Sequence, residues 1–367
     1  MHLHGLATAL PPAAFTQAQC WDLLQRSEAR QRLSRRSMLT LHAILRHESG
    51  IATRHFALPE MERVFNLGAD ELNEAFRREA PRLAVRALEP ALAQAGLAAD
   101  QVDALLVCTC TGYLCPGVTS YVAELLGLRP NAFLQDLVGL GCGAAIPLFR
   151  AAEAVTTAQP NAVVACVAVE ICSAAFYLDD DPGVLVSACL FGDGAAATVW
   201  RGTPGPLGLQ CGDFSTVHQP ANRERIRFEM RQGKLRNLLH ASVPTLAAAA
   251  VRQLLTEESS RPQRREISRL IAHVGGRDVL DAIEAACAGF DLTASRQVLR
   301  DCGNMSSPSV VFALERALQD SAPDVAADWW LTSFGAGFSA HGCRLSRSGC
   351  AGGGGGIRRA KPGAGPV

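Results

Sequence analysis

Three side chains in this sequence have the chemistry for acyl transfer: the thiol of Cys142, the imidazole of His273 and the amide of Asn304. Cys142 lies between two glycines in the run DLVGLGCGAAIPLFRAAEAV, where an apolar strand is expected to turn into an amphipathic helix. The unpaired N–H groups and partial positive charge of a helix N-terminus lower the pKa of a thiol below its free value of about 8.5. A cysteine is more often a small buried hydrophobe, but this position predicts a thiolate nucleophile.

His273 ends the apolar run ISRLIAH, and Asn304 lies in DCGNMSSPSVVFALERAL, ahead of a second amphipathic stretch. An imidazole near the thiol would hold it as thiolate, and the amide would donate a hydrogen bond to a substrate oxygen that gains charge. Asparagine before a helix is also typical of an N-cap. Papain-like proteases have the same order of Cys, His and Asn. Cys142 lacks their C-G-[SA]-C-W context and lies far from the N-terminus, which disfavours a peptidase.

The elements that must position these residues follow from the apolar patterns. VDALLVCT (102–109) and NAVVACVAV (161–169) are apolar almost throughout, which is typical of parallel strands buried on both faces. From Phe76 to Gly96 apolar positions recur with a period near 3.6, which predicts a helix with a kink or break at Pro81 or Pro90. The sequence therefore predicts a layered α/β protein.

Two segments of the first half have counterparts in the second. VDALLVCTCTG resembles ISRLIAHVGGR, and GLGCGAAIPLFRAAEAV resembles DCGNMSSPSVVFALERAL. In the latter pair a proline opens each helix, at Pro147 and Pro308. We infer a duplicated fold with halves over residues 1–205 and 206–345. A Gly-rich tail over 346–367 is expected to be disordered.

Composition excludes several classes of protein. The 367 residues include 35 Lys+Arg and 35 Asp+Glu, so no excess charge favours nucleic acid. The 13 cysteines are odd in number and mostly lie in apolar runs, which argues against a disulfide framework. Cys108 and Cys110 have no second Cys/His pair, so no metal site is expected. Without an apolar membrane span or a signal segment, we expect a soluble cytoplasmic protein.

Five motifs resemble those of the type III polyketide synthases, the chalcone and stilbene synthase family: GLGCGAAIP, LFGDGAAATVW, HVGGRDVLDAIE, GNMSSPSVVFALE and FGAGFSAHG. The resemblance extends from about residue 3 to residue 345 and is closer to the bacterial branch than to the plant branch. It implies a thiolase-like fold, with duplicated α/β halves in an α/β/α/β/α arrangement, and a homodimer. Ketoacyl synthase III shares this fold and triad, but its H-Q-A-N motif is absent here.

The resemblance also implies a reaction. Cys142 would take a starter from an acyl-CoA as a thioester. Malonyl-CoA would lose carbon dioxide, and His273 and Asn304 would stabilise the enolate that attacks the acyl-Cys142 thioester. Repeated extension and cyclisation would give an aromatic or pyrone polyketide, with no metal or redox cofactor.

Further residues match pocket positions of the family. Phe191 matches a gatekeeper between the coenzyme A tunnel and the cavity, and Arg54 matches a basic stretch that grips coenzyme A phosphates. Asp193 is expected to shape the Gly-Asp-Gly turn. The other matching positions are Cys110, Thr111, Cys115, Cys172, Ser306, Gly335 and Ala336.

These matches carry three expectations about the pocket. The resemblance implies a cis bond between Cys115 and Pro116. A second gatekeeper phenylalanine has no clear counterpart in RFEMRQGKLRNLL. Thiols in place of larger pocket side chains would enlarge the cavity, so we expect room for a long or fatty acyl starter.

Two other functions stay open on the sequence alone. A ketoacyl synthase III-type condensing enzyme would use an acyl carrier protein and need a basic docking patch. RERIRFEMRQGKLR (223–236) could form that patch, or equally a solvated amphipathic helix. The second alternative is a catalytically silent thiolase-fold scaffold, but the intact Cys142, His273 and Asn304 argue against it.

Overall fold

Both halves of the chain contribute strands to one sheet. The computed structural model describes residues 1–46, 49–320 and 326–347, so most of the predicted tail (346–367) lies outside the described residues. The first half contains β1 (His2–Ala9), β4 (Ala104–Cys108), β5 (Phe133–Leu137), β6 (Val164–Glu170) and β7 (Gly194–Arg201). The second contains β8 (Leu209–Arg223), β11 (Ile267–Ala272), β12 (Ala327–Gly335) and β13 (Gly337–Arg347). The strand order is β11-β12-β13-β8-β1-β7-β6-β4-β5, and the halves meet where Leu3 pairs with Leu209.

The two halves pair their strands in the same pattern. β4 and β6 are parallel, and the antiparallel strands β7 and β1 follow them. β11 and β12 are likewise parallel and are followed by the antiparallel strands β13 and β8. This repeated pattern confirms the duplication predicted from the two pairs of matching segments.

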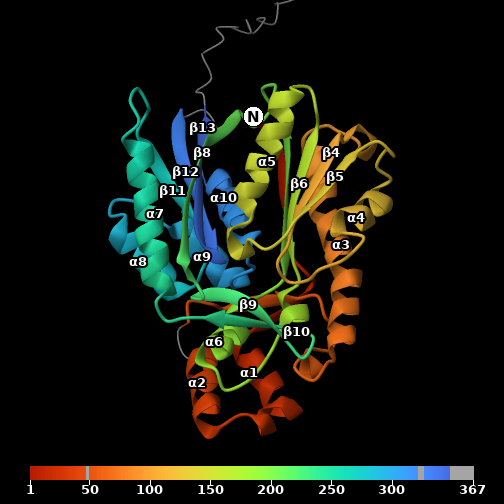
Figure 1. Ribbon diagram of the computed structural model, residues 1–367, viewed down its shortest axis with the longest axis vertical. Helices are drawn as coiled ribbons and strands as arrows, with labels where there is room; N and C mark the ends of the chain where they lie inside the picture. Colours follow the sequence, from red (N-terminus) through yellow and green to blue (C-terminus); the bar gives the residue numbers. More distant parts are fainter. Residues whose placement is uncertain (47–48, 321–325, 348–367) are drawn as a thin grey trace, which may run out of the picture.

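Helices form three layers around these strands (Figure 1). α5 (Ala145–Ala158) and α10 (Ser309–Gln319) contact strands of both halves and form the central layer. α3 (Ala69–Gln94) and α4 (Val118–Leu126) cover the first half, and α7 (Val243–Ser259) covers the second, beside α8 (Arg277–Ala286) and α9 (Thr293–Cys302). The strands of each half form one β layer, on either side of the central helices, so the predicted α/β/α/β/α arrangement is confirmed. Strands that are apolar on both faces need a helical layer on each side.

The predicted strands and helix are present. Every residue of β4 and β6 is buried. α3 begins before Phe76 and continues unbroken through Pro81 and Pro90, so the expected break is wrong. The apolar face of α3 packs against β1, β6 and β7, and this packing outweighs the cost of about 3 kcal/mol for a proline in a helix.

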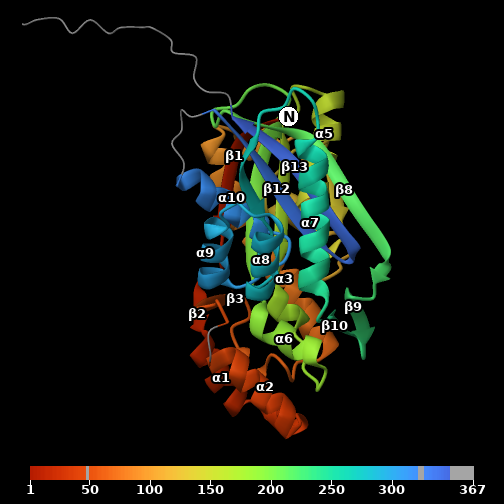
Figure 2. The same cartoon turned by 90° about the vertical axis from the view of Figure 1, so that its left-hand side faces the viewer.

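A cap of shorter elements lies at one end of the layers (Figure 2). It contains α1 (Gln17–Arg26), α2 (Arg35–Arg46), α6 (Pro182–Leu190) and two small sheets, β2 (Ala13–Thr16) with β3 (Thr53–Phe56) and β9 (Ile226–Arg231) with β10 (Lys234–Leu239). The run 223–236 is therefore a β-hairpin, and its interpretation as an amphipathic helix is wrong. Gln232 and Gly233 both have positive φ. This conformation is typical of the two-residue turn that joins two paired antiparallel strands.

Candidate active site

Cys142 lies on a short turn, Gly141–Gly143, which follows β5 and precedes α5. We call it the cysteine turn. Gly141 has a φ of 58°, which lets the chain bend sharply before the helix begins at Ala145. The predicted position of the thiol between a strand and a helix is confirmed, and Cys142 is buried.

The end of β12 supports the cysteine turn. A side chain at Gly335 would place its Cβ 2.5 Å from the backbone N of Gly143, so no larger residue fits there. Ser333 donates a hydrogen bond of 2.9 Å to the carbonyl of Gly143. Ala336 packs against Gly141, where a Cβ would lie 3.0 Å from the Ala336 N. Gly335 and Ala336, expected to contact substrate, therefore hold the turn in place.

His273 and Asn304 come from the second half. His273 follows β11, and its ring makes a T-shaped contact with the ring of Phe334 of β12, with ring centroids 5.1 Å apart. Asn304 forms a parallel β-bridge with Phe191 of the first half. The backbones of the two halves are thus hydrogen-bonded beside the candidate site.

One cavity brings the three predicted catalytic residues together. Cys142, His273 and Asn304 all line it, and all three are buried. The exposed residues His240 and Arg277 also line it, so the cavity leads from the buried triad to the surface. We call it the outer cavity.

The Asn304 amide is oriented by its own loop. Its Oδ1 accepts the N–H of Ser306 at 2.7 Å, so the donors of Nδ2 are the part of the amide left for a substrate. The Nδ1 atom of His273 is buried and has no hydrogen-bond partner among the described residues. The site therefore presents an amide donor and an imidazole, as an oxyanion site requires.

Burial decides the protonation of the thiol and the imidazole. It raises the pKa of Cys142 to about 12, against the smaller lowering effect of a 3.1 Å hydrogen bond from the Ser306 hydroxyl. Burial also lowers the pKa of His273 to about 3. The expected lowering of the Cys142 pKa is wrong, because desolvation of the thiolate outweighs the effect of the helix end. The thiol of Cys142 and the imidazole of His273 are therefore both neutral in the free site.

A second, inner cavity lies on the other side of Cys142 and Phe191, which line both cavities. Phe191 therefore borders both cavities, and its role as a gatekeeper stays a prediction. The inner cavity has a volume of about 20 Å³, and the outer cavity has a volume of about 650 Å³. Its other lining residues are Thr111, Cys172, Ala175, Phe176, Tyr177, Val184, Ser187, Ala188, Phe228, Asn237 and Ser306.

Glu170 lies next to the inner cavity and was not among the predicted site residues. Its fully buried carboxylate accepts hydrogen bonds from the hydroxyls of Thr111 (2.8 Å) and Ser307 (2.5 Å) and from the N–H of Cys110 (2.9 Å). Burial raises its pKa. Cys110 in turn has its Sγ 3.2 Å from the Ser306 hydroxyl. Glu170 thus fixes both loops around the thiol, and a lone acid at the end of an apolar strand is the signal that could have revealed it.

Arg54 is buried in the fold. Its side chain donates to Oε1 of Gln17 (3.0 Å) and to the carbonyls of Ala188 (2.8 Å) and Phe191 (2.9 Å). These donors are used inside the fold, so the expected contact with coenzyme A phosphates is wrong. Arg54 holds the backbone of Phe191 instead. Asp193 is also buried, and its carboxylate accepts the N–H groups of Ala57 and Ser173, both outside the Gly-Asp-Gly turn that it was expected to shape. These contacts tie the turn to two other segments of the chain.

Comparison with known proteins then decides the family. Residues 11–203 match a family model described as FAE1/type III polyketide synthase-like protein. Residues 215–346 match the C-terminal domain of chalcone and stilbene synthases. The chain belongs to the type III polyketide synthase family.

Similar polyketide synthases cover nearly the whole chain. A 1,3,6,8-tetrahydroxynaphthalene synthase from Streptomyces peucetius subsp. caesius is 32% identical over 348 residues, 91% of this chain and 89% of that protein. A phloroglucinol synthase from Pseudomonas fluorescens is 26% identical over 338 residues, 90% of this chain and 94% of that protein. The crystal structure of 1,3,6,8-tetrahydroxynaphthalene synthase from Streptomyces coelicolor has a TM-score of 0.84 at 26% identity and covers 96% of this chain and 100% of that chain. These relatives support the polyketide synthase over the ketoacyl synthase III and scaffold alternatives.

Cys115 stands apart from the cavities of this polyketide synthase. The Cys115–Pro116 bond is cis, as expected. The Cys115 side chain is exposed and does not line the outer or the inner cavity. The expected substrate contact is therefore not made within this chain.

In residues 1–46, 49–320 and 326–347, no cluster of three His, Cys, Asp or Glu side chains is placed to hold a metal ion. Over the same described part, no helix has the length and apolarity to cross a bilayer.

Proposed function

We propose that this polyketide synthase loads an acyl-CoA starter on Cys142 and extends it with malonyl-CoA by decarboxylative condensation. The observation that carries the proposal is the convergence of Cys142, His273 and Asn304 on the outer cavity. A nucleophile and hydrogen-bond donors lie together there in a buried site, where donors aimed at developing charge are most effective.

Loading begins when the thiol of Cys142 attacks the thioester carbonyl of the starter. The thiol proton passes to the neutral ring of His273, which returns it to the sulfur of coenzyme A as the C–S bond of the substrate breaks. The products of this step are the acyl-Cys142 thioester and free coenzyme A.

Extension uses malonyl-CoA in the outer cavity. Its bond to the carboxylate breaks, carbon dioxide leaves, and the electron pair moves into the thioester as an enolate. His273 and Nδ2 of Asn304 donate to the enolate oxygen. Because burial lowers the pKa of His273 to about 3, the ring is neutral and offers an N–H without an acidic proton that would quench the enolate. The enolate carbon attacks the acyl-Cys142 carbonyl, and the Cys142 sulfur leaves.

The outer cavity also suits the coenzyme A portion of both substrates. Arg277 lines its exposed end, with a side chain 50% accessible to solvent and an ion pair of 3.2 Å to Asp278. A guanidinium at this end can bind phosphate oxygens through paired N–H donors. We therefore assign to Arg277 the phosphate contact that Arg54 cannot make. The proposed cycle needs no cofactor beyond the coenzyme A thioesters.

The inner cavity favours a small starter. Its volume of about 20 Å³ holds about one or two water molecules. Phe176, Tyr177 and Phe228 line this space, so the small pocket cysteines do not produce the enlargement expected for a fatty acyl starter. We propose a starter the size of acetyl or malonyl. The names of the relatives support an aromatic product.

We propose further that the enzyme is a homodimer. β5 is an edge strand of the sheet, and Phe133 and Leu134 on it are 54% and 38% exposed. Val138, just beyond the strand, is 50% exposed. An apolar strand with an open edge is a template for pairing with another chain, and a second copy would cover it.

The test is to incubate the protein with labelled malonyl-CoA and acetyl-, benzoyl- or decanoyl-CoA and to identify products by mass spectrometry. Cys142→Ala should abolish the acyl-enzyme in intact-protein mass spectra. Cys287→Ser, which changes a buried thiol just after α8 and outside both cavities, should still form it. Turnover seen only with carrier-protein thioesters, or acylation that survives in Cys142→Ala, would overturn the proposal.

A further inference from the structure

The β9–β10 hairpin turns one face toward both cavities. The cross-strand partners Phe228 and Asn237 line the inner cavity, and the partners Ile226 and Leu239 line the outer one. This spacing follows the alternation of side chains along a strand. The position of the hairpin therefore sets the distance between one wall of the cavities and Cys142.

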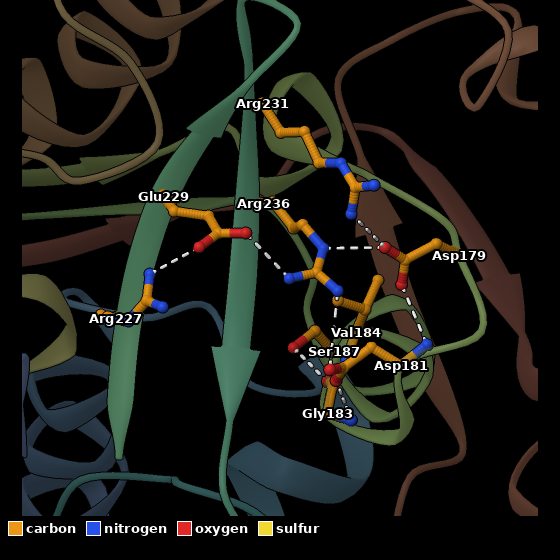
Figure 3. A network of polar contacts seen from close by, with 9 residues as sticks. All are labelled: Asp179, Asp181, Gly183, Val184, Ser187, Arg227, Glu229, Arg231 and Arg236. Carbon is orange, nitrogen blue, oxygen red and sulfur yellow. Dashed lines mark hydrogen bonds and ion pairs between the residues drawn. The ribbon is translucent and has the colours of Figure 1, made fainter. Parts of the chain in front are cut away.

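Arg236, on the other face of the hairpin, joins it to the loop before α6 (Figure 3). Its Nη1 donates to the carboxylate of Glu229, its cross-strand partner, at 2.9 Å. Its Nε donates to Asp179 at 2.8 Å, and its Nη2 lies 3.5 Å from the carboxylate of Asp181. We call these three contacts of Arg236 the hairpin clamp.

The loop held by the clamp leads to Phe191. Asp181 is the N-cap of α6, where its carboxylate accepts the N–H groups of Gly183 (2.8 Å) and Val184 (3.3 Å). α6 supplies lining residues to both cavities and ends at Leu190, directly before Phe191. A shift of Asp181 would therefore move α6, and with it Phe191, which follows α6 and lines both cavities.

The same loop and helix make two more close contacts. Asp180 accepts the N–H of Ser34 (2.9 Å) and the hydroxyl of Ser37 (2.6 Å), which ties the loop to α2. The first turn of α6 packs on the hairpin so closely that a Cβ on Gly183 would lie 2.4 Å from the carbonyl oxygen of Leu239. The hairpin clamp thus adds ion pairs beside a contact in which the hairpin and α6 are already closely packed.

Burial separates the hairpin clamp from ordinary surface ion pairs. The side chain of Arg236 is 10% exposed, whereas Arg77, which pairs with Glu74 on α3, is 46% exposed. Exposed pairs contribute little to the geometry of a protein because water competes for both partners. A buried guanidinium shared by carboxylates holds them firmly. Its removal leaves Asp179 and Glu229 with only their outer ion pairs, to Arg231 (3.5 Å) and Arg227 (2.8 Å), and with no group that joins the hairpin firmly to the loop.

We propose that Arg236 is a positioning residue for starter selection: the hairpin clamp holds Phe228 and Asn237 close to Cys142 and so keeps the inner cavity too narrow for large starters. This inference rests on the proposed function. Arg236 does not line either cavity, so it acts through the hairpin and not on the substrate.

The test compares wild type with Arg236→Gln, which removes the charge and keeps much of the side chain. For each protein, kcat/KM is measured with acetyl-CoA and with decanoyl-CoA as starter, at saturating malonyl-CoA. We expect the ratio of decanoyl-CoA to acetyl-CoA to rise about tenfold, since a wall that relaxes removes a steric penalty of that order. Arg236→Lys, which keeps the charge, should lie between the two.

Matched variants separate positioning from general instability. Arg77→Gln removes an exposed ion pair and should leave the ratio as in wild type. Asp179→Asn weakens the clamp from the loop side without changing a residue of the hairpin and should raise the ratio in the same direction. Loss of stability alone lowers both kcat/KM values together, so an unchanged ratio in Arg236→Gln and Asp179→Asn would overturn the inference. If wild type makes no product from any acyl-CoA, the proposed function fails first.

Discussion

Replacement of Arg54 by methionine tests whether this residue supports the fold or binds coenzyme A. The change leaves three buried oxygens without their donor: Oε1 of Gln17 and the carbonyls of Ala188 and Phe191. An unsatisfied buried acceptor costs about 1–3 kcal/mol, and methionine refills much of the side-chain volume. For the three acceptors together we therefore expect the free energy of unfolding to fall by about 3–9 kcal/mol, measured by urea unfolding.

Kinetics on the folded variant supply the second readout. Since Arg54 holds the carbonyl of Phe191, its loss should lower kcat with malonyl-CoA and with malonyl-N-acetylcysteamine to a similar extent. The second thioester lacks the phosphates of coenzyme A. Arg277→Gln is the comparison, because that guanidinium lies at the exposed end of the outer cavity. It should raise KM about fivefold for malonyl-CoA only, as expected for one lost charged contact.

The reasoning on Arg54 would be refuted by the opposite pattern. An Arg54→Met protein with the unfolding free energy of wild type, and with a raised KM for malonyl-CoA but not for the truncated thioester, would mean that Arg54 reaches the phosphates after all.

Three further predictions follow from the site and the edge of the sheet. Burial lowers the pKa of His273 from 6.5 to about 3, so the neutral ring favours the folded state above pH 6.5 and this contribution declines as the pH falls below that value. Between about pH 8 and about pH 5, wild type should lose about 2 kcal/mol more unfolding free energy than His273→Asn, and equal losses in urea unfolding would contradict this. Gly335→Ala places a Cβ 2.5 Å from the backbone N of Gly143 and should slow acyl-enzyme formation at Cys142 by about tenfold or more, because the cysteine turn has to move. An unchanged rate in rapid-quench mass spectrometry would contradict this. Phe133→Asp puts a charge on the exposed edge of β5 and should halve the molar mass measured by light scattering. A variant that stays dimeric would place the interface elsewhere, and a monomeric wild type would exclude the dimer.

The sequence by itself determined the elements and the identity of the reacting groups. Continuous apolar runs predicted β4 and β6, because a strand buried on both faces has no polar side to show. The matching contexts of Cys142 and Asn304 predicted the duplication, since each half repeats the same strand, turn and helix. These signals are local, and local patterns report burial and period without any knowledge of the neighbours.

Only the tertiary structure decided the state of the side chains and the shape of the cavity. The thiol of Cys142 is desolvated by segments from both halves, so its pKa rises where a helix end alone would lower it. Arg54 was predicted to bind phosphates, but the fold brings the carbonyls of Ala188 and Phe191 to its guanidinium. The sequence gives no sign that Arg236 forms a clamp, because its partner Asp179 lies 57 residues earlier and is brought beside it only by the fold. Contacts of this kind join residues far apart in sequence, and burial is a property of the whole packed molecule. Neither leaves a local pattern that the sequence could show.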